Sequence, residues 1–376
     1  MVAPLPPLRG GVSDFSAGLA SALKDEVSLE VLTFRSVSPD ALHPDGRAGS
    51  GETADVTVLR ALDWRDPLGW LLSGSLVQAD VLHLQHWSLQ LIPVLLIVAL
   101  MFRLRNKKVV VTLHNVRSHE LSPGYVAGTA LLCLLAHRCV VHWQGGIEEA
   151  RKVLGIRGEK VVRIPLGVSL PGAPDAPDRA AARRDLGLPP DAPVVLCAGR
   201  ISPYKGLPVM LRAMPRLLQQ VPDAVLLVAG KPSEAWESYA SLIEELGIGD
   251  NVKTILRYLD HPELSRCFAA ADVVVLPYTR FAAQSGVGSQ AVGFGKALVV
   301  ADVGALPELV EDNRMIVAPG DWHALAQRVA LCLANPGLRA RLEDASRRLA
   351  AERSWKNVAA RTADLYRSLC TERYRD

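Results

Sequence analysis

The sequence lacks several features that would mark its class at once. It contains no CxxC pair, only 5% of its residues are aromatic, and its formal net charge is +3 over 376 residues. Proteins that bind nucleic acid concentrate basic residues on one face, so this charge balance indicates no nucleic-acid partner. The scattered cysteines predict buried, reduced thiols in a cytoplasmic protein. They are Cys133, Cys139, Cys197, Cys267, Cys332 and Cys370.

Segments that would enter or cross a membrane are also missing. The amino terminus, Met1 to Pro7, lacks the positive start and continuous apolar stretch of a signal peptide. We therefore expect the chain to stay inside the cell. The longest apolar run, Leu91 to Phe102, is interrupted by Pro93 and falls short of the roughly 20 residues that span a bilayer.

Two interpretations of this apolar run are open. In the first, the run forms a buried helix of an ordinary globular core. In the second, the basic residues that follow it form a collar beside an apolar helix, as interfacial helices have, and the protein docks peripherally on the inner face of a membrane. Those basic residues are Arg103, Arg105, Lys107 and Lys108.

The composition and the segment pattern predict two α/β domains. Hydrophobic residues make up 49% and charged residues 22% of the chain, which is too long for one ordinary core. Short apolar runs that suit buried parallel strands alternate with helical patterns, which is typical of doubly wound Rossmann-like domains. The expected strands are Val27–Phe34, Val56–Leu62, Val81–Leu84, Val109–Leu113, Cys139–His142, Val194–Ala198, Val225–Ala229, Val252–Leu256, Val273–Pro277 and Leu298–Ala301.

Composition also predicts the boundaries. A first domain over residues 1–168 precedes a linker rich in Pro, Ala and Asp at 169–191, and a second domain follows over 192–352. A helical pattern at 353–376 could pack on either domain. Only Met1 to Leu5 precede the first glycine-rich turn, so the first strand looks truncated.

An anion site is predicted between a buried strand and a helix that begins near Leu207. The stretch Gly199-Arg200-Ile201-Ser202-Pro203-Tyr204-Lys205-Gly206 joins the two. A helix amino terminus carries partial positive charge, so two fixed cations there are stabilised when a phosphate joins them. Pairing of Arg200 and Lys205 with surface carboxylates is the alternative.

A second anion-binding feature is predicted at Gln284-Ser285-Gly286-Val287-Gly288, ahead of a short helix over Ser289–Phe294. Its small residues would let backbone amides approach a ligand, and the helix terminus again favours an anion. Ser285, Gly286 and Val287 are therefore candidate ligand-binding residues.

The order and spacing of these motifs resemble the retaining glycosyltransferases of the GT-B fold, in the large family 4, over nearly the whole chain. The resemblance implies two Rossmann-like domains that face a cleft. The matching elements are Gly10-Gly11-Val12, Thr112-Leu113-His114-Asn115, Ile164-Pro165-Leu166-Gly167-Val168, Gly199-Arg200 with Lys205-Gly206, Ala271-Asp272-Val273-Val274-Val275-Leu276-Pro277, and Gly295-Lys296 through Gly304-Ala305-Leu306-Pro307-Glu308.

The resemblance also implies a function: transfer of a sugar from a nucleotide-diphosphate sugar to a glycan or lipid-linked acceptor, with retention and without a metal or other cofactor. Arg200 and Lys205 would hold the donor diphosphate and stabilise the leaving group. Gly10 and Gly11 would bring backbone near the phosphates, unless they form a plain tight turn. His114 would lie near the transferred sugar or the acceptor, unless it is a core or surface histidine.

Two positions depart from the family pattern, in which a pair of glutamates lies eight residues apart. Ala282 replaces the glutamate near the donor sugar, and Gln290 replaces the one that contacts the ribose. Gln290 can still form hydrogen bonds to a hydroxyl. The alternative function is a catalytically degenerate GT-B scaffold that binds a nucleotide or partner without turnover.

Other histidines lie near these motifs. His119 and Glu120 follow His114 and are candidates for acceptor contact. His83 and His86 lie three apart on a predicted strand, so they should point to opposite faces and not share a metal. A nicotinamide-dependent dehydrogenase is disfavoured because no GxGxxG follows the first strand.

Overall fold

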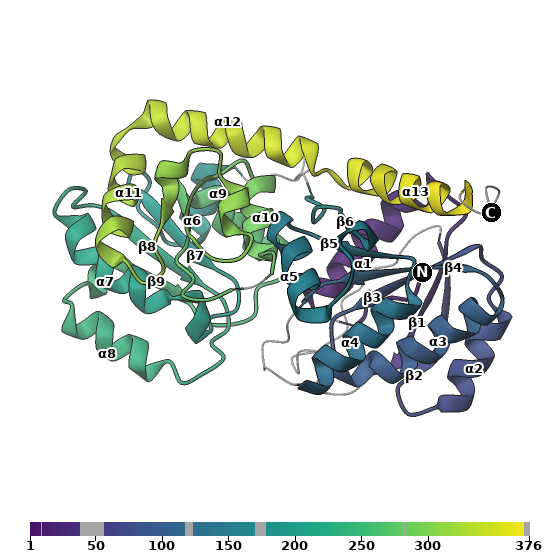
Figure 1. The fold of residues 1–376 in the computed structure, drawn as a ribbon. Helices are drawn as coiled ribbons and strands as arrows, with labels where there is room; N and C mark the ends of the chain where they lie inside the picture. The colour runs from purple at the N-terminus through teal and green to yellow at the C-terminus, as the bar shows by residue number, and fades with distance from the viewer. Residues whose placement is uncertain (9, 38–55, 117–122, 170–177, 282, 372–376) are drawn as a thin grey trace. The chain divides into compact units, whose positions relative to one another are not determined.

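The computed structural model describes residues 1–8, 10–37, 56–116, 123–169, 178–281 and 283–371. The chain divides into two compact units (Figure 1). Unit 1 comprises Met1–Gly167 together with Arg353–Asp376, and unit 2 comprises Val168–Glu352. Each unit is built on parallel strands with helices on both faces, so the predicted α/β class is confirmed.

Unit 2 contains a six-stranded parallel sheet in the order β12-β11-β10-β7-β8-β9. In chain order within the unit this is the 3-2-1-4-5-6 arrangement of a Rossmann fold, whose strand order reverses between β7 and β10. Ligands of such sheets bind at the carboxyl ends of the strands beside the reversal. The strands are β7 (Val194–Ala198), β8 (Val225–Ala229), β9 (Val252–Ile255), β10 (Val273–Leu276), β11 (Ala297–Ala301) and β12 (Ile316–Val317).

Seven helices of unit 2 surround this sheet among the described residues. The helix α7 begins after the left-handed Gly206 and has a proline in its first turn, as the sequence predicts. Its buried residues pack into the unit's core against α11. The helices are α6 (Arg179–Asp185), α7 (Leu207–Leu218), α8 (Glu237–Glu245), α9 (His261–Ala270), α10 (Gly286–Gly293), α11 (Trp322–Ala334) and α12 (Pro336–Glu352).

Residues 178–191, which the composition assigns to a linker, fold onto unit 2. The helix α6 packs against α9, and Arg183, only 1% exposed, donates to a carboxylate oxygen of Asp272 at 2.8 Å. The same carboxylate oxygen accepts from the backbone amide of Val194. A buried guanidinium with this partner anchors the segment, which composition alone does not reveal.

Unit 1 contains two groups of parallel strands. One pairs β1 with β2, and the other has the order β3-β4-β5-β6. All five strands expected in this half are present with shifted ends, whereas β6, three residues long, lies outside the expectation. The strands are β1 (Glu30–Ser36), β2 (Thr57–Asp63), β3 (Val81–His86), β4 (Lys108–Leu113), β5 (Arg138–Val141) and β6 (Val161–Arg163).

The amino-terminal residues join these two groups. Val2 forms parallel bridges with Leu32 on β1 and with Leu84 on β3. Its amide donates to the carbonyl of His83, and its carbonyl accepts from the amide of Gln85. With this segment counted as a strand, unit 1 also follows the Rossmann order, and its reversal lies between Val2 and β3. The amino-terminal segment, which the sequence suggested was a truncated strand, therefore lies between the two groups of strands, near the centre of the sheet.

Helices cover both faces of the unit 1 sheet. On one face α1 (Gly11–Leu23) packs against α13 (Trp355–Thr371), the helix that the sequence could not assign to a domain. Phe15, Leu19 and Leu23 of α1 are buried together with α13. The other face carries a row of three helices, with α5 (Gln144–Leu154) packed beside the last (Figure 1). The row consists of α2 (Pro67–Leu76), α3 (Ile92–Leu104) and α4 (Pro123–Leu135).

Candidate functional site

The predicted anion-binding residues of unit 2 gather where its sheet order reverses. Arg200 and Lys205 follow β7, and the Ser285–Val287 stretch follows β10, the neighbouring strand. The loops after these parallel strands meet at the carboxyl edge of the sheet. Thus one edge of unit 2 combines two cations with a helix amino terminus.

Glycines allow these loops to approach one another closely. Gly199 has φ +85°, and a Cβ added there would lie 2.5 Å from Val287 Cγ2 and 3.1 Å from Lys205 Nζ. Gly206 has φ +70°, and its added Cβ would collide with the carbonyl oxygen of Pro277. Any other residue at these two positions would be strained and would push the loops apart. The same geometry places the Lys205 ammonium beside the first turn of α10.

The Lys205 ammonium is in an environment that opposes its charge. Burial and the charge of Arg200 lower the pKa of Lys205, whereas Tyr204 and Cys197 act in the opposite direction. No carboxylate in the described part of the chain forms an ion pair with Lys205. Arg200 is exposed at the same edge. A buried ammonium beside a second positive charge is stabilised by an anion.

The helix α10 begins three residues earlier than the sequence suggests. It starts at Gly286 instead of Ser289, because the Ser285 hydroxyl accepts from the Gly288 amide at 3.1 Å and caps the helix. Tyr278 forms a second hydrogen bond with this hydroxyl, at 3.0 Å. Ser285 therefore orients the helix, while the amides of Gly286 and Val287 lie in the first turn, where a helix offers no internal acceptor.

Three aromatic side chains support this edge, and the sequence pattern did not predict their role. Tyr204 stacks on Phe281 with ring centroids 5.9 Å apart, and Tyr278 meets Phe281 edge-on at 5.2 Å. The Lys205 ammonium lies 5.7 Å from the centroid of the Tyr278 ring. The only sequence signal was their position next to the strand-end motifs, since Tyr204 directly precedes Lys205 and Tyr278 directly follows the strand expected to end at Pro277.

The sugar end of the predicted donor site is less fully described. Gln290 is half-buried on α10, one turn beyond the residues of the anion site. Ala282, His119 and Glu120 lie outside the described residues. In the described part of the chain, no cluster of three or more His, Cys, Asp or Glu side chains could hold a metal ion.

The remaining predicted residues lie at the carboxyl edge of the unit 1 sheet. Gly10 has φ +134° and Gly11 begins α1, so this turn leads directly into a helix amino terminus. Phe15, one turn along α1, contacts the ring of His114 edge-on with centroids 4.9 Å apart. His142, at the end of β5, lies 5.1 Å from the His114 ring. The structure thus gathers Gly10, Gly11 and His114 at one edge of unit 1.

A buried hydrogen-bond network determines which His114 nitrogen carries the proton. Nε2 of His114 lies 2.9 Å from the carbonyl oxygen of the Gln85 side chain, which only accepts, so Nε2 is the donor. Burial, followed by the neighbouring histidines, lowers the pKa of His114 well below its usual value. His114 is therefore neutral at pH 7, and its Nδ1 is an acceptor.

The network continues to the carboxyl-terminal helix. The Gln85 amide nitrogen approaches Nε2 of His83 at 3.4 Å, and the same nitrogen of His83 meets the Thr112 hydroxyl at 2.7 Å. Nδ1 of His83 contacts the Tyr366 hydroxyl of α13 at 2.5 Å. His86 points to the opposite face and meets Thr129 on α4. The prediction that His83 and His86 share no metal is thus consistent with their geometry.

Comparison with known proteins adds to this geometry. Residues 178–349 match the family model of the glycosyl transferases group 1. D-inositol 3-phosphate glycosyltransferase from Streptomyces bingchenggensis is 32% identical over 251 residues, which cover 64% of this chain and 55% of that protein. The corresponding protein from Nocardioides sp. is 37% identical over 209 residues, covering 50% and 44%. The chain thus spans about half the length of these curated relatives.

A solved structure extends the likeness to both units. Anabaena HepE in complex with UDP superposes with a TM-score of 0.74 at 20% identity, covering 98% of this chain and 99% of that one. At this identity the likeness concerns the fold. The chain therefore has the GT-B fold, and the part that matches the glycosyl transferases group 1 is residues 178–349.

Proposed function

We propose that the protein transfers a sugar from a nucleotide-diphosphate sugar to an acceptor hydroxyl, with retention of the anomeric configuration. One observation carries this proposal: a half-buried Lys205, next to Arg200, faces the amino terminus of α10 without a carboxylate partner in the described chain. An edge with this charge suits the diphosphate of such a donor. HepE, a protein with the same fold, was solved with UDP bound.

The proposed chemistry follows from the charge on the leaving group. As the glycosidic bond breaks, negative charge builds on the nucleoside diphosphate, and fixed cations stabilise this charge more than they stabilise the intact donor. Lys205 and Arg200 would supply the positive charge. We therefore propose that transfer needs no metal ion, so that an excess of EDTA leaves the rate unchanged.

The acceptor would bind at the carboxyl edge of unit 1. His114 has an unprotonated Nδ1 there, and its ring contacts Phe15 of α1, so it can accept a hydrogen bond from a sugar or acceptor hydroxyl. We propose a glycan or lipid-linked precursor as acceptor. Because two relatives are named for D-inositol 3-phosphate, that compound belongs among the acceptors tested.

The test begins with binding and proceeds to turnover. Nucleotide-sugars with different bases and sugars are screened by thermal shift, and release of nucleoside diphosphate is then measured with and without acceptor. We expect at least one donor to raise the melting temperature and to be consumed when an acceptor is added. Binding without release of nucleoside diphosphate for every donor would favour the catalytically degenerate scaffold.

Retention needs its own measurement. The anomeric configuration of the product bond is read by nuclear magnetic resonance and compared with that of the donor. An inverted product would leave the transferase proposal intact but overturn retention, and with it the assignment to family 4.

A further inference from the structure

The row of helices α2, α3 and α4 on unit 1 has an unusual outer surface. A surface helix normally has an apolar face toward the core and a charged face toward water. Over Pro67–Leu76, Ile92–Leu104 and Pro123–Leu135 the only charged residue is Arg103. The three neighbouring helices are thus apolar on both sides.

Leucine side chains are exposed along the whole row. Of the ten large hydrophobic side chains exposed among the described residues, seven lie on these three helices. Such a concentration is far from the scattered single residues of ordinary surfaces. The seven are Leu68 (72% exposed), Leu71 (43%), Leu72 (60%), Leu100 (46%), Leu104 (72%), Leu131 (49%) and Leu134 (69%). We refer to these seven residues as the leucine face.

The three helices that carry the leucine face pack closely against one another. A Cβ added at Gly74 of α2 would lie 3.1 Å from Met101 Cβ on α3. A Cβ added at Gly128 of α4 would lie 2.8 Å from Ile92 Cδ1, also on α3. Small residues at both helix contacts let the backbones approach, so α3 lies between α2 and α4 (Figure 1). Each of the three helices carries exposed leucines.

Basic residues gather at the carboxyl ends of the same helices. The Arg105 guanidinium follows α3 and donates to the carbonyls of Gly74, Ser75 and Val77 at the end of α2. The Lys160 ammonium donates to the carbonyl of Leu134 on α4 at 3.2 Å. Cations are favoured at these negative helix ends, and here they border the leucine face.

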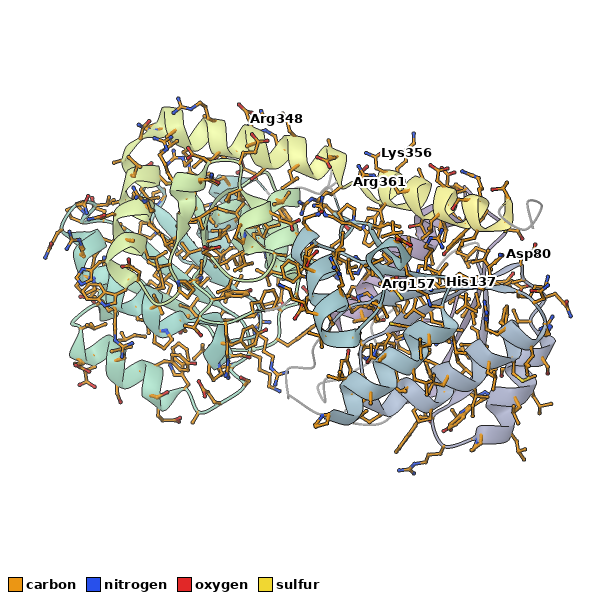
Figure 2. The ribbon with its side chains drawn as sticks, viewed as in Figure 1. Asp80, His137, Arg157, Arg348, Lys356 and Arg361 are labelled. Carbon is orange, nitrogen blue, oxygen red and sulfur yellow. The ribbon has the colours of Figure 1, made fainter. Side chains whose placement is uncertain are left out.

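His137 lies near several cations of this basic border. It follows α4, is labelled in Figure 2, and contacts the guanidinium of Arg103 on α3. Burial and the charges of Arg103, Lys108 and Lys160 lower the pKa of His137 to about 4. At neutral pH the histidine is therefore uncharged, and the surrounding cations supply the positive charge of the border.

We propose that the leucine face and its basic border bind the surface of an anionic lipid bilayer. Exposed apolar side chains would enter the headgroup boundary, while the flanking arginine and lysine side chains would meet lipid phosphates. None of the helices among the described residues is long and apolar enough to cross a bilayer, so the proposed contact lies on its surface. This proposal does not depend on the transferase activity.

A second copy of the chain fits the same surface less well. A two-fold contact would place identical patches against each other, and the only charged side chain on the three helices is a cation. The border adds further cations, apart from Lys107, which pairs with Asp80 at 2.8 Å. Lipid phosphates complement that charge, whereas another leucine face would repeat it.

The experiment is vesicle co-sedimentation of the full chain. Vesicles of phosphatidylcholine alone are compared with vesicles containing phosphatidylglycerol, at low and at high salt. We expect binding to the anionic vesicles, weakened by salt. The combined substitution Leu72→Ser, Leu104→Ser and Leu134→Ser should weaken it by roughly tenfold or more, since each buried leucine contributes apolar area.

Controls separate membrane binding from loss of folding and from self-association. Tyr258→Ser changes an exposed large side chain of unit 2, 52% exposed, and should leave vesicle binding unchanged. Because the three leucines are exposed, circular dichroism should show the triple variant folded. Absence of vesicle binding by the unsubstituted chain, or equal binding by the triple variant, would overturn the proposal. A dimer in sedimentation velocity that the triple substitution dissociates would instead assign the face to self-association.

Discussion

The electrostatic state of single residues links this fold to its proposed chemistry. Burial and the charge of Arg200 lower the pKa of Lys205, so a bound anion would stabilise its ammonium group. His114 is held neutral by burial and by its neighbours, with its proton directed to Gln85. One residue is thus suited to bind negative charge and the other to accept a hydrogen bond.

Substitution of Lys205 tests the anion site. Lys205→Ala should weaken nucleoside-diphosphate binding by roughly tenfold to a hundredfold, because a charge-assisted hydrogen bond is lost from a partly buried site. The measurement is the thermal shift caused by UDP and by other nucleoside diphosphates. Lys253→Ala, an exposed lysine on β9, is the matched control. An unchanged shift for Lys205→Ala would remove this residue from the site.

The buried histidines of unit 1 should make its stability depend on pH. Burial lowers the pKa of His86 from 6.5 to about 4, so between these values the unfolded chain binds a proton that the folded chain does not. The free energy of unfolding should therefore fall as pH decreases from 6.5 to 4. Each such histidine contributes about 1.4 kcal/mol per pH unit.

Urea unfolding at several pH values in this range measures how the free energy of unfolding of unit 1 changes with pH. His86→Gln should reduce the number of protons taken up on unfolding by about one and so make this dependence less steep. His323→Gln, at an exposed position in unit 2, should leave the dependence unchanged. An identical slope in the His86 variant would show that this residue does not resist protonation in the folded state.

The tautomer of His114 is a separate test of the network. In Gln85→Leu the acceptor for Nε2–H is lost, so the proton should redistribute between the two ring nitrogens. Nitrogen chemical shifts of labelled histidine report this population directly and do not require activity. If the Nε2–H form remains dominant in Gln85→Leu, Gln85 does not position the His114 ring.

At the scale of elements, the residues proposed to bind the substrates lie beside the amino termini of helices. The helix α10 begins directly after its capping residue Ser285, and its first turn lies against the loop that carries Lys205. In unit 1 the helix α1 begins directly after the Gly10 turn. In both units a helix terminus therefore meets the carboxyl edge of a sheet.

The cap of α10 should affect both stability and binding. Ser285→Ala should cost about 1 kcal/mol of unfolding free energy and also weaken nucleoside-diphosphate binding, since the first turn would fray. Asp321 caps α11 in the same way, through the Ala324 amide at 2.9 Å. Asp321→Ala should cost similar stability and leave binding unchanged. If Ser285→Ala and Asp321→Ala bound nucleoside diphosphate equally well, the Ser285 cap would have no role in ligand binding.

At the scale of the whole molecule, the two units draw on different parts of the chain. Unit 1 is completed by α13, whose residues share a core with α1, whereas unit 2 is one continuous segment. The carboxyl-terminal helix should therefore control the stability of the unit that contains the amino terminus.

Leu369→Ala tests this dependence. Leu369 is fully buried on α13, so its truncation should cost roughly 2–5 kcal/mol and loosen unit 1 alone. Hydrogen exchange should accelerate in α1 and β4 and stay unchanged in β7 and β8. Met214→Ala, in the core of unit 2, should give the opposite pattern. Acceleration in both units for either variant would show that they do not unfold independently.

Local pattern was sufficient for much of the fold. Short β-branched runs bounded by polar turns predicted β7 and β8 to the residue, because a strand buried on both faces must be apolar throughout. Glycine and cation spacing likewise predicted the residues that gather at the edge of unit 2. The strands β6 and β12 were not predicted, because a strand of two or three residues is too short to show an apolar run or an alternation.

Tertiary structure alone decided the features that depend on distant residues. The contact of His83 with Tyr366 joins residues 283 positions apart, and no local rule relates them. Likewise, the ion pair between Arg183 and Asp272 holds a segment on unit 2 although the composition of that segment is typical of a linker. For Leu91–Phe102 the sequence showed apolar character, but only the packing of α3 between α2 and α4 determines which of their leucines face the solvent. Local residue order specifies strands, turns and helix ends, whereas exposure and pairing depend on which surfaces the folded chain brings together.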